Sequence, residues 1–134
     1  MTAARILIVE DNQANRALMD YLLRAFGYAV LLAEDGEQGL DMARRDQPDL
    51  ILLDLQLPKM TGFDVLKRLR DRHPASPPIV VAVTAFAMVG DRERVLAHGF
   101  DAYLSKPIEP EQFVPQIEAL LPARLRVPRT GKTP

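Results

Sequence analysis

Three short runs of aliphatic residues, none with a polar residue at every second position, stand out along the chain. They are RILIVE at 5–10, LILLDL at 50–55 and IVVAVT at 79–84. A strand that is covered on both faces has this pattern, because neither face needs polar side chains. Weaker runs of the same kind are YAVLLA at 28–33 and AYL at 102–104. The pattern therefore predicts five strands in a parallel sheet.

Between these runs, apolar residues recur with the spacing of helices. Leu18, Leu22, Ala25 and Phe26 indicate a helix over 13–26, and similar stretches lie at 36–45, 62–72, 91–98 and 110–121. Gly27, Gly99 and Pro122 follow three of these stretches as stop signals. Strand and helix thus alternate along the chain. This order predicts an α/β fold, a doubly wound five-stranded parallel sheet with right-handed crossovers and helices on both faces.

Composition limits the classes of function. The chain has 134 residues, of which 48% are apolar and 26% charged, with a net charge of −1. This balance is typical of a soluble globular protein and lacks the basic surplus of nucleic-acid binders. Cysteine is absent, which excludes disulfides and cysteine-ligated metals and is compatible with a cytoplasmic location. No apolar run reaches membrane-spanning length and no signal sequence is present, so we expect no membrane association.

The last 13 residues differ in character from the rest. PARLRVPRTGKTP, at 122–134, contains three prolines, four cations and no acid. We therefore predict one domain over 1–121, followed by a basic, proline-containing and disordered tail over 122–134. Such a tail is too short to form a second folded unit.

The residues at the carboxyl ends of the strands are chemically distinctive, and ligands of open parallel sheets bind at that edge. Glu10 and Asp11 follow the first strand, Asp54 ends the third, Thr84 ends the fourth, and Lys106 follows the fifth. Three carboxylates at one edge repel each other, and one ammonium group does not compensate them. Oxygen ligands of this kind favour Mg²⁺, which in turn favours a phosphoryl-bearing ligand.

This set of side chains suits phosphoryl transfer. Asp54 can act as a nucleophile and form an acyl phosphate. Lys106 would neutralise charge on the phosphoryl oxygens, and Thr84 would donate a hydrogen bond to one of them. Each residue type has a role that fits its chemistry.

The same residues resemble a known family. Glu10-Asp11, Asp54, Thr84-Ala85 and Lys106-Pro107 occur in the order and at the strand ends found in receiver (CheY-like) domains of two-component response regulators, and the match covers residues 5–121. The stretch AVTAFAMVGDRERVLAHGFDAYLSKPI is most similar to single-domain regulators of the DivK type and to receivers of hybrid histidine kinases. The resemblance implies a flavodoxin-like sheet of order 2-1-3-4-5.

The resemblance also implies a role for each residue. Asp54 would accept a phosphoryl group from the phosphohistidine of a sensor histidine kinase or a histidine phosphotransfer protein. Glu10, Asp11 and Asp54 would hold Mg²⁺ together with the backbone carbonyl of Gln56. Lys106 would pair with Asp54 and then with the phosphoryl group, and its bond to Pro107 is expected to be cis.

The remaining implications concern signalling. Thr84 and Tyr103 would form a switch pair that alters the surface of the fourth helix, fifth strand and fifth helix, where a downstream target protein binds. The residues expected to face partners are Asn15, Arg16 and Met19 for the phosphodonor, and Met88, Ser105 and Ile108 for the target. The protein would be a phosphoacceptor that catalyses only its own phosphorylation and dephosphorylation.

Other interpretations stay open at this point. The chain could be the receiver fragment of a hybrid histidine kinase. A phosphatase of the haloacid dehalogenase type uses a similar set of groups but carries its nucleophile in a DxDxT run on the first strand. A flavodoxin-like cofactor binder needs a glycine- or hydroxyl-rich phosphate loop after the first strand, where this chain has EDNQAN. Asp11, taken alone, would also suit the cap of the first helix.

Overall fold

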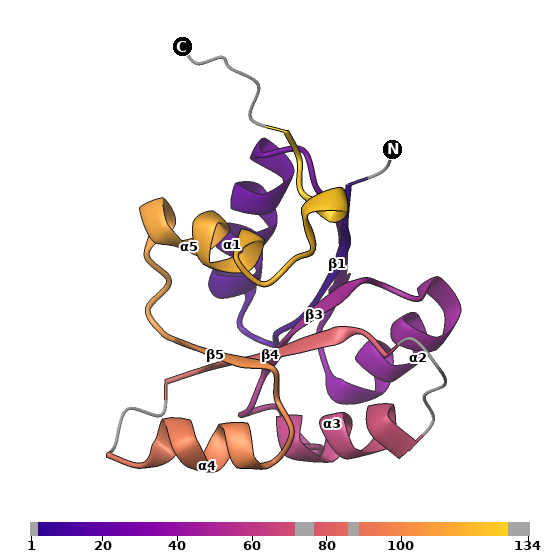
Figure 1. Cartoon of the computed structure of the whole chain (residues 1–134). Coiled ribbons are helices and arrows are strands. Elements are labelled where there is room, and N and C mark those ends of the chain that lie inside the picture. Colours follow the sequence, from indigo (N-terminus) through magenta and orange to yellow (C-terminus); the bar gives the residue numbers. More distant parts are fainter. Residues whose placement is uncertain (1–2, 72–76, 86–88, 129–134) are drawn as a thin grey trace.

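The computed structural model describes residues 3–71, 77–85 and 89–128 (Figure 1). Strands and helices alternate through these ranges. The elements are β1 (Arg5–Val9), α1 (Gln13–Ala25), β2 (Ala29–Ala33), α2 (Gly36–Asp46), β3 (Leu50–Asp54), α3 (Gly62–Asp71), β4 (Ile79–Thr84), α4 (Asp91–Ala97), β5 (Ala102–Ser105), α5 (Pro110–Glu118) and the 3₁₀ helix η1 (Ala123–Leu125). None of the helices in these ranges is both long and apolar enough to cross a membrane.

The five strands form one parallel sheet in the order β2-β1-β3-β4-β5. Helices α1 and α5 cover one face of this sheet, and α2, α3 and α4 cover the other (Figure 1). The predicted fold class and strand order are thus confirmed. All strands run in the same direction, so their carboxyl ends meet at one edge of the sheet.

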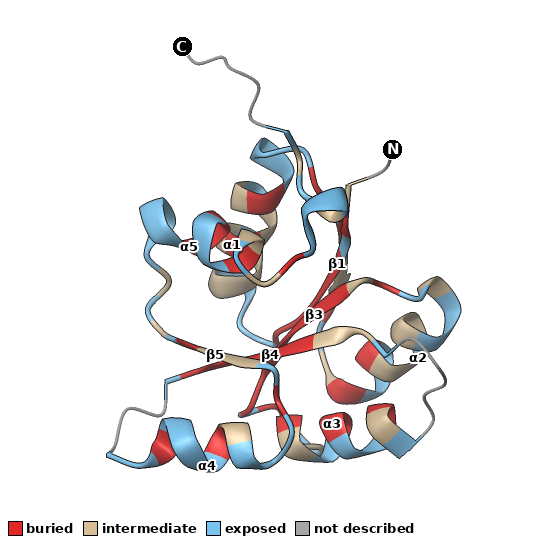
Figure 2. Cartoon of the chain, in the orientation of Figure 1, coloured by how far each residue is buried: buried red, intermediate tan, exposed pale blue. Residues whose placement is uncertain are grey.

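The central strand β3 is buried along its whole length (Figure 2). Because side chains alternate between the two faces of a strand, Leu50 and Leu52 pack under α1 and α5, whereas Ile51 and Leu53 pack under α3 and α4. Each of these four side chains contributes about 1.5–3 kcal/mol by leaving water. The burial on both faces explains why the sequence of β3 shows no polar alternation.

Helix α1 buries a face next to the one predicted, and Leu22 of the predicted set packs at the margin of the same core. Met19 and Leu23 lie in the core, each 1% exposed or less, whereas Leu18 and Leu22 are only partly buried and Phe26 is exposed. Both pairs have the same four-residue spacing, so the periodicity alone does not distinguish them. Met19 therefore cannot face a phosphodonor, and its prediction as a partner-surface residue is wrong.

The segment after α5 also differs from the prediction. Residues 122–128 are not a disordered tail. They lie beside the amino-terminal end of β1 and include the 3₁₀ helix η1 (Figure 1). The amide of Ala4 donates to the carbonyl of Leu125 at 2.9 Å, and the amide of Val127 donates to the hydroxyl of Tyr28 at 3.0 Å. Leu125 and Val127 pack against the core under α1 and α5. Residues 129–134 lie outside the described ranges.

These contacts predict that the segment stabilises the domain. We expect a chain ending at Leu121 to lose about 2–3 kcal/mol of unfolding free energy, because two partly buried apolar side chains and the hydrogen bonds to Ala4, Tyr28 and Leu121 are lost. Urea denaturation measures this difference. A chain ending at residue 128 keeps all of these contacts and serves as the control, which should match the full-length protein. Equal stability of the chain ending at Leu121 would contradict the structural role of this segment.

Candidate functional site: a carboxylate cluster at the sheet edge

The candidate site lies at the carboxyl edge of the sheet, where four strands bring polar side chains together. Glu10 follows β1, Asp54 ends β3, Thr84 ends β4, and Lys106 follows β5. Glu10, Asp54 and Thr84 are 1%, 3% and 0% exposed. Polar side chains are rarely buried to this extent without a structural or chemical reason.

Three carboxylates form the centre of the site. One oxygen from each of Glu10, Asp11 and Asp54 lies within 4.8 Å of the others, and Asp11 is the exposed member of the group. The structure thus brings together the three acids that the sequence analysis placed at this edge. Asp11 does not cap α1, because the N-cap is Asn12, whose side-chain oxygen accepts from the amide of Asn15 at 2.9 Å.

Lys106 is the cation that faces the two buried acids. Its Nζ lies 3.0 Å from Oε1 of Glu10 and 3.3 Å from Oδ2 of Asp54. The amide of Lys106 donates to the carbonyl of Thr84 at 2.9 Å, which ties the β5 end to the β4 end. The following bond to Pro107 is cis in the structure.

The second oxygen of each buried carboxylate is held by the main chain. The amide of Asn12 donates to Oε2 of Glu10 at 3.1 Å, and the amide of Gln56 donates to Oδ1 of Asp54 at 3.0 Å. Oε1 of Glu10 is different. It is fully buried and accepts no hydrogen bond of good geometry from the described residues, although Nζ of Lys106 is within ion-pair distance.

Burial and charge shift two protonation equilibria. Burial raises the pKa of Glu10 and the charge of Asp54 adds to this, while the contact with Lys106 opposes it. Burial alone would lower the pKa of Lys106, but the contact with Glu10 and the charges of both acids outweigh it, so the pKa of Lys106 is raised. The ammonium of Lys106 is therefore firmly charged. This single positive charge does not balance the three carboxylates around it.

The residues present fit a hard divalent cation. All three candidate ligands are carboxylates, and among the described residues the buried Oε1 of Glu10 has an ion-pair contact with Lys106 but no hydrogen bond of good geometry. Oxygen ligands without nitrogen or sulfur favour Mg²⁺ over zinc. A divalent ion here would offset the repulsion that one ammonium leaves uncompensated.

Comparison with known proteins identifies the family. The response regulator receiver domain family matches residues 6–118. The chain belongs to this family. The DivK polar-differentiation response regulators of Brucella anthropi and Brucella ovis are each 45% identical over 116 residues, which cover 87% of this chain and 94% of theirs. The protein is therefore a DivK-like receiver domain of the two-component signalling class.

Solved structures agree with this assignment. The chemotaxis response regulator CheY4 of Vibrio cholerae has a TM-score of 0.83 at 28% identity, covering 90% of this chain and 100% of that one. The receiver domain of the sensor histidine kinase PA1611 from Pseudomonas aeruginosa has a TM-score of 0.78 at 34% identity, covering 88% and 97%. That structure carries a magnesium ion in its active-site cleft.

In this receiver domain, Arg16 has a role that the sequence analysis missed. Its Nη1 donates to the carbonyl of Glu10 at 2.8 Å, and its Nη2 lies 4.0 Å from Glu34. The side chain is only 15% exposed. Arg16 was predicted to face the phosphodonor. In the structure its side chain is mostly buried, and its guanidinium group holds the main-chain carbonyl of Glu10. No local sequence pattern signals this contact between a helix and the residue six positions before it.

Gly62 also supports the receiver site. A Cβ at this first residue of α3 would lie 2.5 Å from the carbonyl oxygen of Asp54 and 2.8 Å from Cα of Leu55. The amide of Gly62 donates to the carbonyl of Leu55 at 3.1 Å. Only glycine therefore lets α3 begin this close to the end of β3. The turn-like PKMTG signals a bend, but not this contact.

The predicted switch and target-facing residues lie beside the site. Tyr103, Ser105 and Ile108 line one cavity of about 380 Å³ together with residues of α4 and α5. Ser105 is exposed, whereas Tyr103 and Ile108 are partly buried. Met88 lies outside the described residues, and the neighbouring Val89 is fully exposed.

Arg16 allows a direct test of how the site is positioned. We expect Arg16→Ala to weaken Mg²⁺ binding by about tenfold, because groups that orient metal ligands typically have effects of this size. Isothermal titration calorimetry measures the affinity. Arg24→Ala is a matched control, since Arg24 also lies on α1 and donates to a main-chain carbonyl, that of Val30 at 2.9 Å. Equal affinities for Arg16→Ala and Arg24→Ala would contradict the positioning role.

Proposed function

We propose that the chain is a single-domain response regulator of a two-component phosphorelay and that Asp54 accepts a phosphoryl group from a phosphohistidine. The observation that carries this proposal is the placement of Asp54. It is buried at the end of the central strand, within 3.3 Å of Lys106 and in one cluster with two further acids. Ligands of open parallel sheets bind outside the carboxyl ends of the strands, so a donor would approach Asp54 from this edge.

The transfer exchanges one bond for another. A carboxylate oxygen of Asp54 forms a bond to phosphorus while the phosphorus–nitrogen bond to the donor imidazole breaks, and the electron pair of that bond stays on the nitrogen. The product is an acyl phosphate on Asp54. The amide of Gln56 keeps Oδ1 oriented, because it donates to that oxygen at 3.0 Å.

Two side chains would stabilise the transferred group. Lys106 already contacts Asp54 and can follow the charge onto the phosphoryl oxygens. Thr84 ends the strand next to β3, where its hydroxyl would donate a hydrogen bond to the same group. Both residues act on charge that is spread over the phosphoryl oxygens in a loose transition state.

Glu10, Asp11 and Asp54, with the backbone carbonyl of Gln56, would hold Mg²⁺. When bound, this ion supplies positive charge to the phosphoryl oxygens. The chain itself supplies the rigid frame. The amide of Asn12 fixes one oxygen of Glu10, and Arg16 fixes its carbonyl. The ligands are therefore oriented before any ion arrives.

The proposed output is a change of surface. Phosphorylation would draw Thr84 toward the new group and Tyr103 into the space behind it. The cavity of about 380 Å³ that Tyr103, Ser105 and Ile108 line would change shape as a result. A downstream target protein binding over α4, β5 and α5 would detect this change. The protein would act in the cytoplasm by association with other proteins, without nucleic-acid or membrane partners, and would catalyse only its own phosphorylation and dephosphorylation.

A second candidate is the receiver fragment of a hybrid histidine kinase. The observation that favours it is the likeness to the receiver of sensor kinase PA1611, at 34% identity. The phosphoacceptor chemistry is the same in both cases. A phosphatase of the haloacid dehalogenase type is disfavoured, because its nucleophile lies on the first strand and Asp54 lies on β3.

Acetyl phosphate with Mg²⁺ tests the proposed phosphoacceptor. Intact-mass measurement should show one added phosphoryl group on the wild-type protein and none on Asp54→Asn, because the amide is a far weaker nucleophile. Asp64→Asn, which changes an exposed acid on α3, is the matched control and should be modified like the wild type. The assignment of Asp54 fails if Asp54→Asn gains the same adduct or if the wild type gains none.

A further inference from the structure

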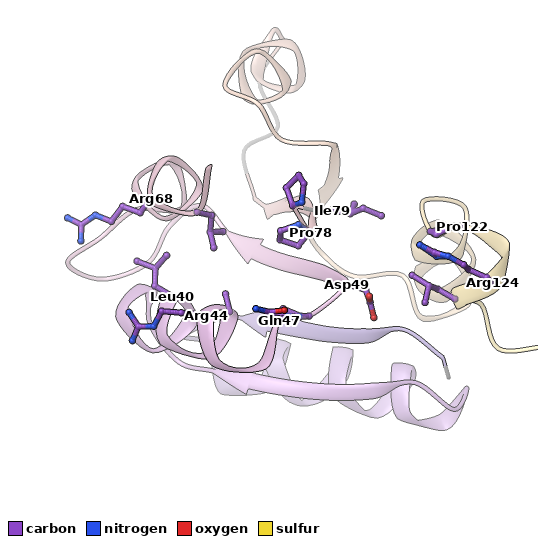
Figure 3. Close-up of a pocket in the computed structure, with 14 residues that line it drawn as sticks. Leu40, Arg44, Gln47, Asp49, Arg68, Pro78, Ile79, Pro122 and Arg124 are labelled. Carbon is purple, nitrogen blue, oxygen red and sulfur yellow. The ribbon is translucent and has the colours of Figure 1, made fainter. Parts of the chain in front are cut away.

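A second concave surface lies at the opposite edge of the sheet from Asp54. It is a groove of about 750 Å³ between the last turns of α2 and α3, the segments that lead into β3 and β4, and η1 (Figure 3). Ile79, the first residue of β4, lines this groove, whereas Thr84 at the other end of the same strand belongs to the phosphorylation site. The two surfaces are therefore separated by the length of the sheet.

Aliphatic side chains and prolines make up much of the groove's lining, and the polar Gln47 and Asp49 lie among them (Figure 3). Leu40, Leu69, Ile79 and Leu125 contribute aliphatic side chains, and the prolines at 48, 77, 78 and 122 also line it. Proline has a fixed φ angle and no amide hydrogen. These prolines therefore offer a ligand apolar contact rather than hydrogen bonds from their main-chain nitrogens.

Cations stand at both ends of the groove. Figure 3 shows Arg44 and Arg68 at one end and Arg124 at the other, with Pro78 and Ile79 between them. Arg44 pairs with Asp41 at 3.2 Å. The side chains of Arg68 and Arg124 make no hydrogen bond or ion pair with any residue in the described ranges. Their charges are thus available to a ligand.

One acid lies among the described lining residues, and it is already engaged. Oδ2 of Asp49 accepts from the amide of Arg5 at 2.9 Å. Cations at the ends of α2 and α3 suit the dipoles of those helices, but Arg124 lies in a single 3₁₀ turn with no comparable dipole. Asp41 balances Arg44, so the excess positive charge of the groove comes from Arg68 and Arg124.

We propose that this groove binds an extended segment of a partner protein in which apolar residues are flanked by acidic residues on both sides. The apolar part would lie on the floor, and the acids would pair with Arg68 at one end and Arg124 at the other. An open groove with exposed cations at its two ends matches a peptide better than a small molecule, because small-molecule sites have convergent polar groups inside an enclosed pocket. Residues 129–134 of the chain itself contain Arg129, Lys132 and no acid, so they have the wrong charge for this groove.

This proposal goes beyond the function proposed for Asp54 and does not depend on it. The two sites use different residues at opposite edges of the sheet. Asp54→Asn should therefore leave peptide binding at the groove unchanged. Failure of either proposal can be recognised without reference to the other.

Fluorescence anisotropy with a panel of short labelled peptides tests the groove. Each peptide carries two acidic residues at each end around a leucine–proline–leucine centre or a close variant of it. At low salt we expect at least one peptide to bind the full-length protein, and Arg68→Glu/Arg124→Glu to weaken that binding by about tenfold or more. Lys67→Glu/Arg92→Glu is the matched control, because it changes the net charge equally at exposed residues that do not line the groove.

Amide chemical shifts in the presence of the peptide locate the binding surface. The expected result is a set of shifts at Gln47, Asp49, Ile79 and Leu125, with Ser105 and Ile108 unaffected. The proposal is overturned if no peptide binds below about 1 mM, if both double variants weaken binding equally, or if the shifts map elsewhere. It is also overturned if inorganic phosphate displaces the peptide as well as an acidic competitor does, which indicates a small-anion site. A self-association that Arg68→Glu/Arg124→Glu abolishes would assign the groove to a second copy of the chain and would overturn it too.

Discussion

The structure depends on the way in which the buried strand β3 delivers a carboxylate to the edge of the sheet. Leu50–Leu53 are covered on both faces, so the end of the strand has little freedom to move. Asp54 therefore stands beside Glu10 whether or not the two charges repel. Removing a carboxylate from water costs several kcal/mol unless a partner compensates it. Lys106 faces both acids, at 3.3 and 3.0 Å, and a single ammonium group does not satisfy both.

Much of the surrounding structure can be understood as a response to this constraint. Amides of Asn12 and Gln56 each donate to one oxygen of a buried acid, and Arg16 holds the main chain of Glu10. Gly62 removes the side chain that would otherwise prevent α3 from approaching β3. What remains is the Oε1 atom of Glu10, buried without a hydrogen bond of good geometry from the described residues. The fold thus builds a site that is rigid and short of positive charge, which suits a signal carried by a reversible phosphoryl group and a divalent ion.

The sequence predicts those features that depend on strand patterns and residue types. Uninterrupted aliphatic runs revealed β1, β3 and β4, and the strand ends then located Glu10, Asp54 and Lys106. The sequence-based prediction failed where two sets of residues have the same helical spacing. Leu18 and Met19 each precede a leucine by four positions, and only Met19 is in the core. The composition of 122–128, rich in cations and prolines, wrongly predicted a disordered tail. Two apolar side chains in this segment, Leu125 and Val127, pack on the core. The roles of Arg16 and Gly62 arise from contacts between elements, which no local pattern encodes.

We infer that the three carboxylates carry more negative charge than Lys106 balances and that Mg²⁺ would supply the missing positive charge. Urea denaturation of the wild-type protein over a series of Mg²⁺ concentrations measures whether the ion stabilises the folded state. A ligand that binds only the folded state adds about 1.4 kcal/mol of unfolding free energy for each tenfold rise in its concentration above Kd. We predict this increase for the wild type and its loss in Glu10→Gln/Asp54→Asn, measured at constant ionic strength. A wild-type unfolding midpoint that does not change with Mg²⁺, or a double variant that gains as much as the wild type, would contradict the account.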